Sequence, residues 1–227
     1  MNRTIHRNDL TFEVDVRWLG LIDYDQAFTL QTQIHQDLID SHQNRIVILG
    51  LEHPSVITLG KRSKAQEDLK MDESKYFEKS ILIRHIDRGG FATLHNPGQL
   101  VIYPLINLQK VNWGIKDYVS IFQGTIRDQI KEIGVDCFCS VDDPGVFSKN
   151  GKIASIGLRI HQQTTMHGAS INIHNDLSEF QLLNPCGMAS RTMDRLGNYT
   201  QISTQDFFLH WVEKFILKIG YHSDTCG

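Results

Sequence analysis

The chain is poor in cysteine and has no long apolar run. Its 227 residues contain four cysteines, at positions 137, 139, 186 and 226. Four unevenly spaced thiols in a chain of this size do not predict the disulfide framework of a small secreted protein. There is no uncharged run of about 18 residues, the length of a membrane-spanning helix, and residues 1–9 lack the apolar segment of a signal peptide. These absences predict a cytoplasmic protein that has no membrane partner.

Several familiar ligand-binding signatures are also missing. The formal net charge of −3 and the pI near 6.4 argue against nucleic-acid binding, which requires a basic surface. The patterns GxxxxGK[ST] and GxGxxG are absent, so the sequence calls for neither ATP nor a dinucleotide. The eleven histidines form no HExxH, and Cys137 and Cys139 have no second cysteine pair to complete a zinc site. We therefore predict no metal and no cofactor, and expect small molecules or proteins as partners.

Hydrophobic periodicity divides the chain into strands and three amphipathic helices. Apolar residues at helical spacing predict helices over 24–41, 115–133 and 203–220, with Asp23 as the cap of the first and Gly134 as the end of the second. Shorter β-rich runs predict strands over 12–21, 45–51, 56–60, 81–86, 100–105 and 164–173. Residues 61–80 are charged, which predicts a solvated loop with a short helix near 73–78.

The order of these elements predicts the fold class. Strands occur in groups instead of alternating strictly with helices. This order favours an α/β fold of the α+β type, with mixed β-sheets and flanking helices, over a doubly wound parallel sheet. The chain is long enough for one substantial core, and no linker divides it. We expect residues 1–227 to form a single catalytic domain that acts as a monomer.

A predicted hairpin and a downstream cysteine form the first candidate site. Two β-rich runs flank Asn150-Gly151, a dipeptide that readily adopts the φ > 0 geometry of a tight turn, so Lys152 begins a strand. Cys186 stands in a Pro-Cys-Gly turn, where proline fixes one side and glycine allows close backbone packing on the other. A lysine cation beside a cysteine is the combination that activates a thiolate. An isolated cysteine is, however, more often an inert apolar residue.

Three further stretches combine small and polar side chains with β structure. Arg88 and His95 place a guanidinium and an imidazole in one segment with two glycines, which suits an acyl carbonyl, a phosphate or a carboxylate. Each stretch alone is equally compatible with ordinary glycine-rich turns and close strand packing. The candidate substrate-binding residues are Arg88, Gly89, Gly90, Phe91, Ala92, Thr93, Leu94, His95, Ser155, Ile156, Gly157, His167, Gly168 and Ala169.

Taken in order, these motifs resemble one enzyme family. The segments that carry the resemblance are LEHPSVITLG at 51–60, RGGFATLHNPGQ at 88–99, GKIASIGLR at 151–159, HGA at 167–169 and NPCG at 184–187. In order and spacing they are similar to the lipoyl(octanoyl) transferases of the LipB type, over residues 19–188. Asn96 departs from the usual HGPGQ turn of that family. The last residues, about forty, carry no family motif.

The resemblance implies both a fold and a reaction. The fold would be that of the biotin and lipoate protein ligases, and the reaction would move an octanoyl or lipoyl group from acyl carrier protein to a lysine of a lipoyl domain. Acceptors would be subunits of 2-oxoacid dehydrogenases and the glycine-cleavage H protein. Cys186 would form the acyl-thioester, while Lys152 would stabilise the thiolate and transfer protons. A thioester donor is already activated, so the reaction would need no ATP.

Three other functions remain open. A lipoate–protein ligase would activate a free acid with ATP, and ATP dependence would identify it. A non-catalytic protein that binds acyl chains or lipoyl domains on the same scaffold would form no covalent adduct. A generic cysteine hydrolase needs a histidine supported by Asp or Asn near Cys186, and the sequence does not clearly place one there.

Overall fold

The elements of the chain are seen in a computed structural model, which describes residues 1–7, 10–140, 142–184 and 192–220. The strands are β1 Asn2–Arg7, β2 Leu10–Leu21, β3 Arg45–Glu52, β4 Val56–Leu59, β5 Leu82–His85, β6 Thr93–His95, β7 Gln99–Leu105, β8 Phe138–Cys139, β9 Gly145–Ser148, β10 Gly151–His161 and β11 Thr164–Asn172. The helices are α1 Tyr24–Asp40, α2 Ala65–Asp68, α3 Glu73–Glu78, α4 Ile115–Glu132 and α5 Thr204–Gly220, with short 3₁₀ helices η1 Leu177–Leu182 and η3 Leu196–Asn198.

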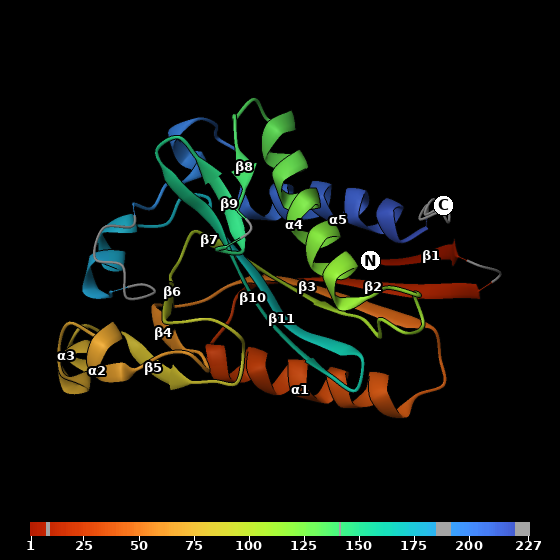
Figure 1. Ribbon diagram of the computed structural model, residues 1–227, viewed down its shortest axis with the longest axis horizontal. Coiled ribbons are helices and arrows are strands. Elements are labelled where there is room, and N and C mark those ends of the chain that lie inside the picture. Colours follow the sequence, from red (N-terminus) through yellow and green to blue (C-terminus); the bar gives the residue numbers. More distant parts are fainter. Residues whose placement is uncertain (8–9, 141, 185–191, 221–227) are drawn as a thin grey trace.

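Two mixed sheets organise these elements (Figure 1). The larger has eight strands in the order β1-β2-β3-β7-β11-β10-β9-β8, and the smaller has the order β5-β4-β6. Within the larger sheet β2 and β3 are parallel, and within the smaller β4 and β5 are parallel. The remaining neighbours are antiparallel. The predicted mixed-sheet architecture is confirmed, and a doubly wound parallel sheet is excluded.

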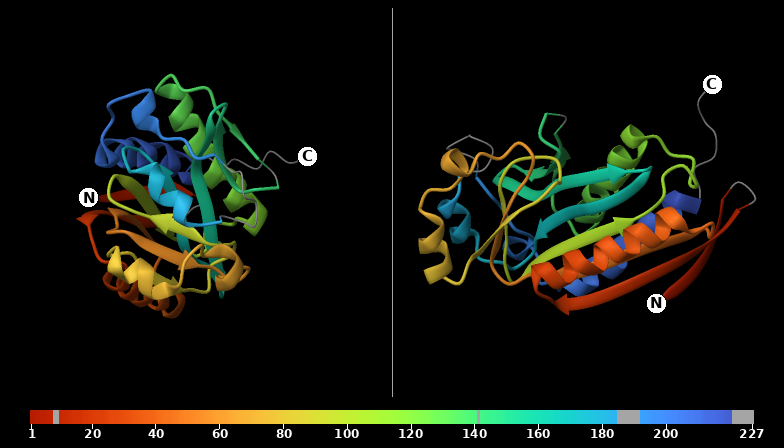
Figure 2. Two further views of the ribbon diagram at one scale, coloured as in Figure 1. Left: turned by 90° about the vertical axis from the view of Figure 1, so that its left-hand side faces the viewer. Right: turned by 90° about the horizontal axis from the view of Figure 1, so that it is seen from below.

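Helices cover both faces of the large sheet. Along β3, Ile46 and Ile48 pack into the core that contains α4 and α5, whereas Val47 and Leu49 pack against α1. This alternation follows from the period of two in a strand, and Figure 1 and the left view of Figure 2 show α1 on the opposite side of the sheet from α4 and α5. A continuous apolar run is therefore buried on both sides, and each fully buried aliphatic side chain contributes about 1.5–3 kcal/mol.

The helix ends follow the predicted capping chemistry. The side chain of Asp23 accepts hydrogen bonds from the backbone N–H groups of Asp25 (2.9 Å) and Gln26 (3.3 Å) at the start of α1. Ser203 accepts from the N–H of Asp206 (3.0 Å) at the start of α5. Gly134, with φ of 86°, follows α4. Such caps satisfy backbone groups that a helix end leaves without an intrahelical partner.

Several local predictions need correction. The two-residue turn of the hairpin is Lys149-Asn150, and Gly151, with φ of 153°, pairs with Ser148 as the first residue of β10. The strands predicted over 45–51 and 56–60 are both present, as β3 and β4, and they belong to different sheets. Strand β1 and helix α2 are additional elements; both are short and polar, so periodicity gives them little signal. Helix α3 lies where the short helix is predicted.

The small sheet has its own apolar cluster with α3 and η1. Tyr76 of α3 is fully buried there, and its hydroxyl donates to the backbone oxygen of Leu182 (2.6 Å). The cluster holds the segment between β5 and β6 against the large sheet, where the N–H of Gly89 donates to the oxygen of Leu158 on β10 (2.9 Å). Within the described ranges, no helix has both the length and the apolar character to cross a membrane.

Candidate active site

A cavity of about 620 Å³ lies between the faces of β10 and β11 and the segment that precedes β6. Its volume is in the range of small-molecule sites, and its lining is mostly apolar. Of the residues predicted from the sequence, those that line it are Arg88, Gly89, Gly90, Phe91, Ala92, Thr93, His95, Lys152, Ser155, Ile156, Gly157, His167, Gly168 and Ala169. Tertiary folding therefore brings three separate sequence stretches and Lys152 to one cavity.

Two predicted residues are not among this lining. Leu94 is 0% exposed and belongs to the apolar cluster of the small sheet. Thr93 and His95 line the cavity on either side of it, because alternate residues of β6 face opposite ways. Leu94 is therefore a core residue and not a candidate for substrate contact. Cys186 lies outside the residues that the structure describes.

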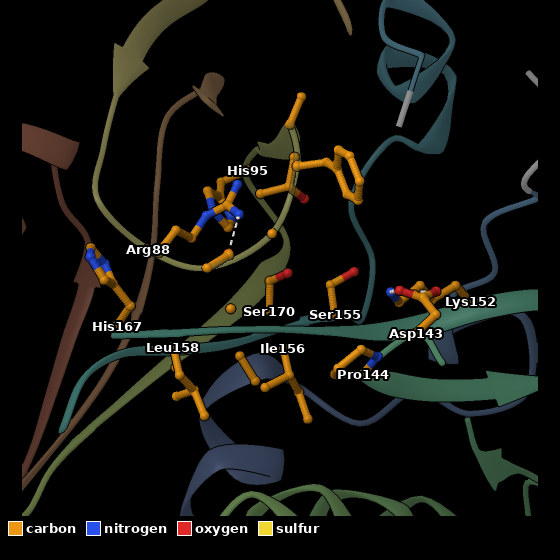
Figure 3. Close-up of a pocket in the computed structure, with 18 of the residues that line it drawn as sticks. Arg88, His95, Asp143, Pro144, Lys152, Ser155, Ile156, Leu158, His167 and Ser170 are labelled. Carbon is orange, nitrogen blue, oxygen red and sulfur yellow. Dashed lines mark hydrogen bonds and ion pairs between the residues drawn. The ribbon is translucent and has the colours of Figure 1, made fainter. Parts of the chain in front are cut away.

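The two faces of β10 contribute differently to the cavity. Figure 3 shows Ser155 and Ser170 pointing toward the side of Arg88, while Ile156 and Leu158 point away from it. Strand β9 pairs with β10 only as far as Ser155, and the cavity lining includes residues of both faces beyond that point. The polar groups thus lie along one face of the strand, and the aliphatic groups lie along the other.

Lys152 marks one end of this face. Its side chain is only 7% exposed, and Nζ lies 2.9 Å from both carboxylate oxygens of Asp143 (Figure 3). Nζ is also 5.3 Å from the centre of the Phe147 ring. Burial of an ammonium is costly without a charged partner, so the Asp143 carboxylate stabilises Lys152 in its place. Asp143 was not predicted from the sequence.

The backbone of Lys152 holds the segment that follows Cys186 in the sequence. Its N–H donates to the oxygen of Thr192 (3.0 Å), and its oxygen accepts from the N–H of Asp194 (3.0 Å). On the other side of Cys186, the N–H of Asn184 donates to the oxygen of Asp68 (2.8 Å). Backbone hydrogen bonds therefore fix the described residues on both sides of the predicted nucleophile. Those after it bond directly to Lys152, and Asn184 before it bonds to Asp68.

A buried carboxylate strengthens this attachment. Asp194 is 2% exposed and accepts from the hydroxyls of Ser148 and Tyr199 (2.6 Å to Tyr199) and from the amide of Asn198 (2.8 Å). Burial acts to raise its pKa, but these hydrogen bonds prevail and hold the pKa below the ordinary aspartate value. An ionised Asp194 at neutral pH therefore locks this segment to the β9–β10 hairpin.

Arg88 lies over the middle of the cavity. One of its terminal nitrogens, Nη2, donates to the backbone oxygen and the hydroxyl of Thr58, each at 2.9 Å, and the other, Nη1, donates to the oxygen of Gly89 (3.0 Å). A Cβ on Gly157 would lie 2.9 Å from Cδ of Arg88. Glycine is therefore required at 157 for the arginine to cross β10 in this position.

His95 is an uncharged part of the lining. Its Nδ1 donates to Oε1 of Gln99 (2.7 Å), whose amide nitrogen donates in turn to Asn172 (2.9 Å). Burial lowers the pKa of His95 to about 3, and the nearby His53 and Arg88 act in the same direction. The imidazole is therefore neutral at neutral pH. This neutrality suits a cavity with a mostly apolar lining.

His167 lies at the end of the cavity opposite Lys152 (Figure 3). It has φ of 60°, which is unfavourable for a residue with a Cβ, and its Nε2 lies 3.5 Å from Asp87. Burial lowers its pKa to about 4, against the opposing effect of Asp87. His167 pairs with Leu158, six residues beyond Lys152 along β10, which corresponds to about 20 Å. This His–Asp pair therefore cannot contact Lys152.

Sequence reasoning also missed lining residues that come from distant elements. They include Tyr24, Arg62, Tyr103, Asp143, Phe180 and Met193. Tyr24 and Tyr103 read as ordinary core aromatics, and no local pattern distinguishes them. His53 is fully buried and interacts with the oxygen of Ile22 (2.8 Å) and the hydroxyl of Tyr103 (3.1 Å).

Among the residues that the structure describes, no group of three or more His, Cys, Asp or Glu side chains is arranged to bind a metal ion.

Cys137 and Cys139 are free thiols on or beside β8. Burial raises the pKa of Cys137 to about 11 and also raises the pKa of Cys139. Both are therefore protonated at neutral pH and poor nucleophiles.

Comparison with known proteins gives consistent matches over most of the chain. A family model, the lipoyl protein ligase A/B catalytic domain, matches residues 23–216. An octanoyltransferase of Cellvibrio japonicus (strain Ueda107) is 33% identical over 218 residues, covering 94% of this chain and 95% of the relative. An octanoyltransferase of Pelobacter propionicus (strain DSM 2379 / NBRC 103807 / OttBd1) is 37% identical over 172 residues, covering 76% and 78%.

A solved structure supports the fold independently. A lipoate-protein ligase A bound with ATP has a TM-score of 0.74 at 15% identity, covering 94% of this chain and 90% of the other. At this identity the likeness concerns the fold alone, and it confirms the expected ligase-like architecture. The matches in sequence are what place the reaction class. Because the family model and relatives of at least 33% identity span most of its length, the chain belongs to the octanoyltransferase family of acyltransferases.

Proposed function

We propose that this octanoyltransferase moves an octanoyl or lipoyl group from acyl carrier protein to a lysine of a lipoyl domain through a thioester on Cys186. The observation that carries the proposal is the position of Lys152. Its ammonium is buried at one end of a mostly apolar cavity, and its backbone is hydrogen-bonded to Thr192 and Asp194, downstream of Cys186. A cation at this point favours a thiolate over a thiol.

The first half-reaction is a thioester exchange. The Cys186 thiolate attacks the octanoyl carbonyl, the bond to the carrier sulfur breaks, and the leaving thiolate takes a proton from the Lys152 ammonium. One thioester replaces another, so the step is close to balanced in free energy and needs no ATP. The acyl chain lies in the cavity against Gly157 and Ala169, beneath the segment that contains Arg88.

The second half-reaction forms the amide. The neutral amine of the acceptor lysine attacks the Cys186 thioester, and the cysteine leaves as a thiolate. The neutral Lys152 amine takes the proton that the new amide nitrogen loses, which restores the starting ammonium. The acceptors we propose are lipoyl domains of 2-oxoacid dehydrogenase subunits and the glycine-cleavage H protein. No cofactor takes part in either step.

Two alternatives are less well supported by the site. A cysteine hydrolase would use a His–Asp pair near the nucleophile, but His167 and Asp87 lie at the cavity end remote from Lys152. An ATP-dependent ligase has the same fold, so the fold does not distinguish a ligase from a transferase. The Pro-Cys-Gly context of Cys186 is the feature that favours the transferase, as it does over a non-catalytic binding protein.

The deciding experiment uses octanoyl-acyl carrier protein without ATP. We expect intact-protein and peptide mass spectrometry to show an octanoyl adduct on Cys186, and an unmodified lipoyl domain to discharge it. Absence of the adduct, together with octanoylation of the lipoyl domain from free octanoate and ATP, would make the protein a ligase. Reversible octanoyl-carrier binding with neither adduct nor transfer would make it a binding protein.

Gly157 provides a test of where the acyl chain lies. We expect Gly157→Val to lower transfer from octanoyl-acyl carrier protein by about 5- to 150-fold, since forcing methyl groups into a packed space costs about 1–3 kcal/mol. Transfer from a butanoyl donor should fall much less, because the shorter chain need not pass Gly157. The measurement is kcat/KM for both donors. A Cβ at 157 would also press on Arg88, so an equal loss for the two chain lengths would point to a displaced Arg88 and not to an obstructed acyl chain.

A further inference from the structure

The contact between Asp143 and Lys152 is more specific than a surface ion pair. Both carboxylate oxygens lie 2.9 Å from Nζ, and the exposed fractions of the two side chains are 22% for Asp143 and 7% for Lys152. Surface pairs contribute little because water screens them, but a pair with one partner buried in a cavity is screened far less. The ammonium is therefore held at one defined point.

The Lys152 side chain passes closely over the backbone of Gly145 on its way to this point. A Cβ on Gly145 would lie 2.5 Å from Cε of Lys152, so only glycine leaves room for the chain to pass along β9. The Phe147 ring lies beside Nζ. Pro144 fixes the backbone between Asp143 and Gly145. The segment Asp143-Pro144-Gly145 thus supplies the carboxylate, the rigid connection and the space in three consecutive residues.

Other charged groups near Lys152 have different environments. Asp142, on the same loop, is exposed to solvent. Asp194 packs on the backbone of Lys152, but its carboxylate is bound to Ser148 and Tyr199. Across the cavity, His95 is neutral at neutral pH, as shown above by the pKa of about 3. Asp143 is thus well placed to govern the charge of the Lys152 ammonium.

We infer that Asp143 is a positioning residue for Lys152: its carboxylate holds the Lys152 ammonium protonated and fixed at one end of the cavity. The inference rests on the proposed function and adds a third group to it. In a nucleophile and proton-transfer pair, a third group commonly orients the second. Here the carboxylate keeps the proton on Nζ until the carrier thiolate leaves and takes it. The carboxylate itself neither gains nor loses a proton in the cycle.

The test compares Asp143→Asn with the full-length wild type in single-turnover acylation by octanoyl-acyl carrier protein. We expect the acylation rate to fall about ten- to hundredfold, a part of what general acid–base catalysis contributes, with carrier affinity changed less than twofold. Without the carboxylate, Lys152 loses its proton at lower pH, so the alkaline limb of the rate profile should move to lower pH. Asp143→Glu should restore the wild-type limb.

Controls separate this inference from its alternatives. Asp136→Asn removes one negative charge from an exposed position next to β8 and should leave the rate and the limb unchanged. If the asparagine variant does not fold, Asp143→Ser removes the charge with a smaller side chain. Wild-type protein that forms no Cys186 adduct would overturn the proposed function. If the wild-type protein forms the adduct normally, and the Asp143→Asn or Asp143→Ser variant has an unchanged acylation rate and an unshifted alkaline limb, this inference alone is overturned.

Discussion

Cys186→Ser is expected to abolish octanoyl transfer, with a loss of roughly 10⁴-fold or more, as for removal of a covalent nucleophile. Lys152 can stabilise a thiolate at neutral pH, but a serine hydroxyl ionises far too weakly for the same cation to activate it. Carrier affinity should persist, because the residues that line the cavity are unchanged. The measurement is single-turnover transfer of labelled octanoate from the carrier to a lipoyl domain.

The other thiols in the described ranges provide matched controls. Cys137 is buried and Cys139 half-buried, and burial raises the pKa of both, to about 11 for Cys137. Cys137→Ser and Cys139→Ser should therefore retain transfer, subject only to a modest loss of stability. Transfer by Cys186→Ser at the wild-type rate would contradict a covalent route and would favour direct attack of the acceptor amine on the donor.

Lys152→Met is expected to lower transfer by about 10²- to 10⁴-fold, the range that a positioned general acid–base group contributes. Methionine is unbranched and suits the mostly apolar cavity, so the fold should remain. Both half-reactions should slow, because no cation then stabilises the Cys186 thiolate and no amine gives or takes the proton in either step. Rates of acylation and of deacylation by a lipoyl domain, measured separately, test this, with thermal unfolding as the check on folding.

Lys152→Arg distinguishes the two roles of the lysine. A guanidinium keeps the positive charge but does not give up its proton at accessible pH. We expect this variant to retain more thiolate character at Cys186, seen as faster alkylation than in Lys152→Met, and yet to fail in turnover. Unchanged turnover in either variant would remove Lys152 from the mechanism. Equal alkylation rates in the two variants would remove its electrostatic role.

The family motifs of the sequence do not contain every residue that builds the site, because Asp143 and the segment after Cys186 also hold Lys152 in place. Lys152 is the second residue of β10 because a two-residue turn precedes Gly151, but its ammonium is placed by a carboxylate nine residues earlier in the chain. The same lysine offers its backbone to Thr192 and Asp194. One residue thus joins the hairpin, the cavity and the flank of the proposed nucleophile.

The sequence by itself determined the long helices, most strands and the residue types of the site. Periodicity is strong in α1, α4 and α5, since each must bury one apolar stripe. Tight-turn preferences located the β9–β10 hairpin to within one residue. The ordered motifs identified the family because a reaction constrains residue types at fixed spacings, whatever the surrounding sequence.

Only the tertiary structure decided which of these residues meet. The assignment of β3 and β4 to different sheets depends on partners far away in the sequence, and no local pattern encodes such pairing. The side of β6 that faces the cavity depends on packing. Leu94 packs into the apolar cluster of the small sheet, whereas Thr93 and His95 line the cavity. The carboxylate on Lys152 depends on a long side chain running past Gly145 to reach Asp143. Which strands pair, which side of a strand faces the cavity and which carboxylate a lysine contacts are properties of the folded chain. They arise from contacts between segments that are far apart in the sequence.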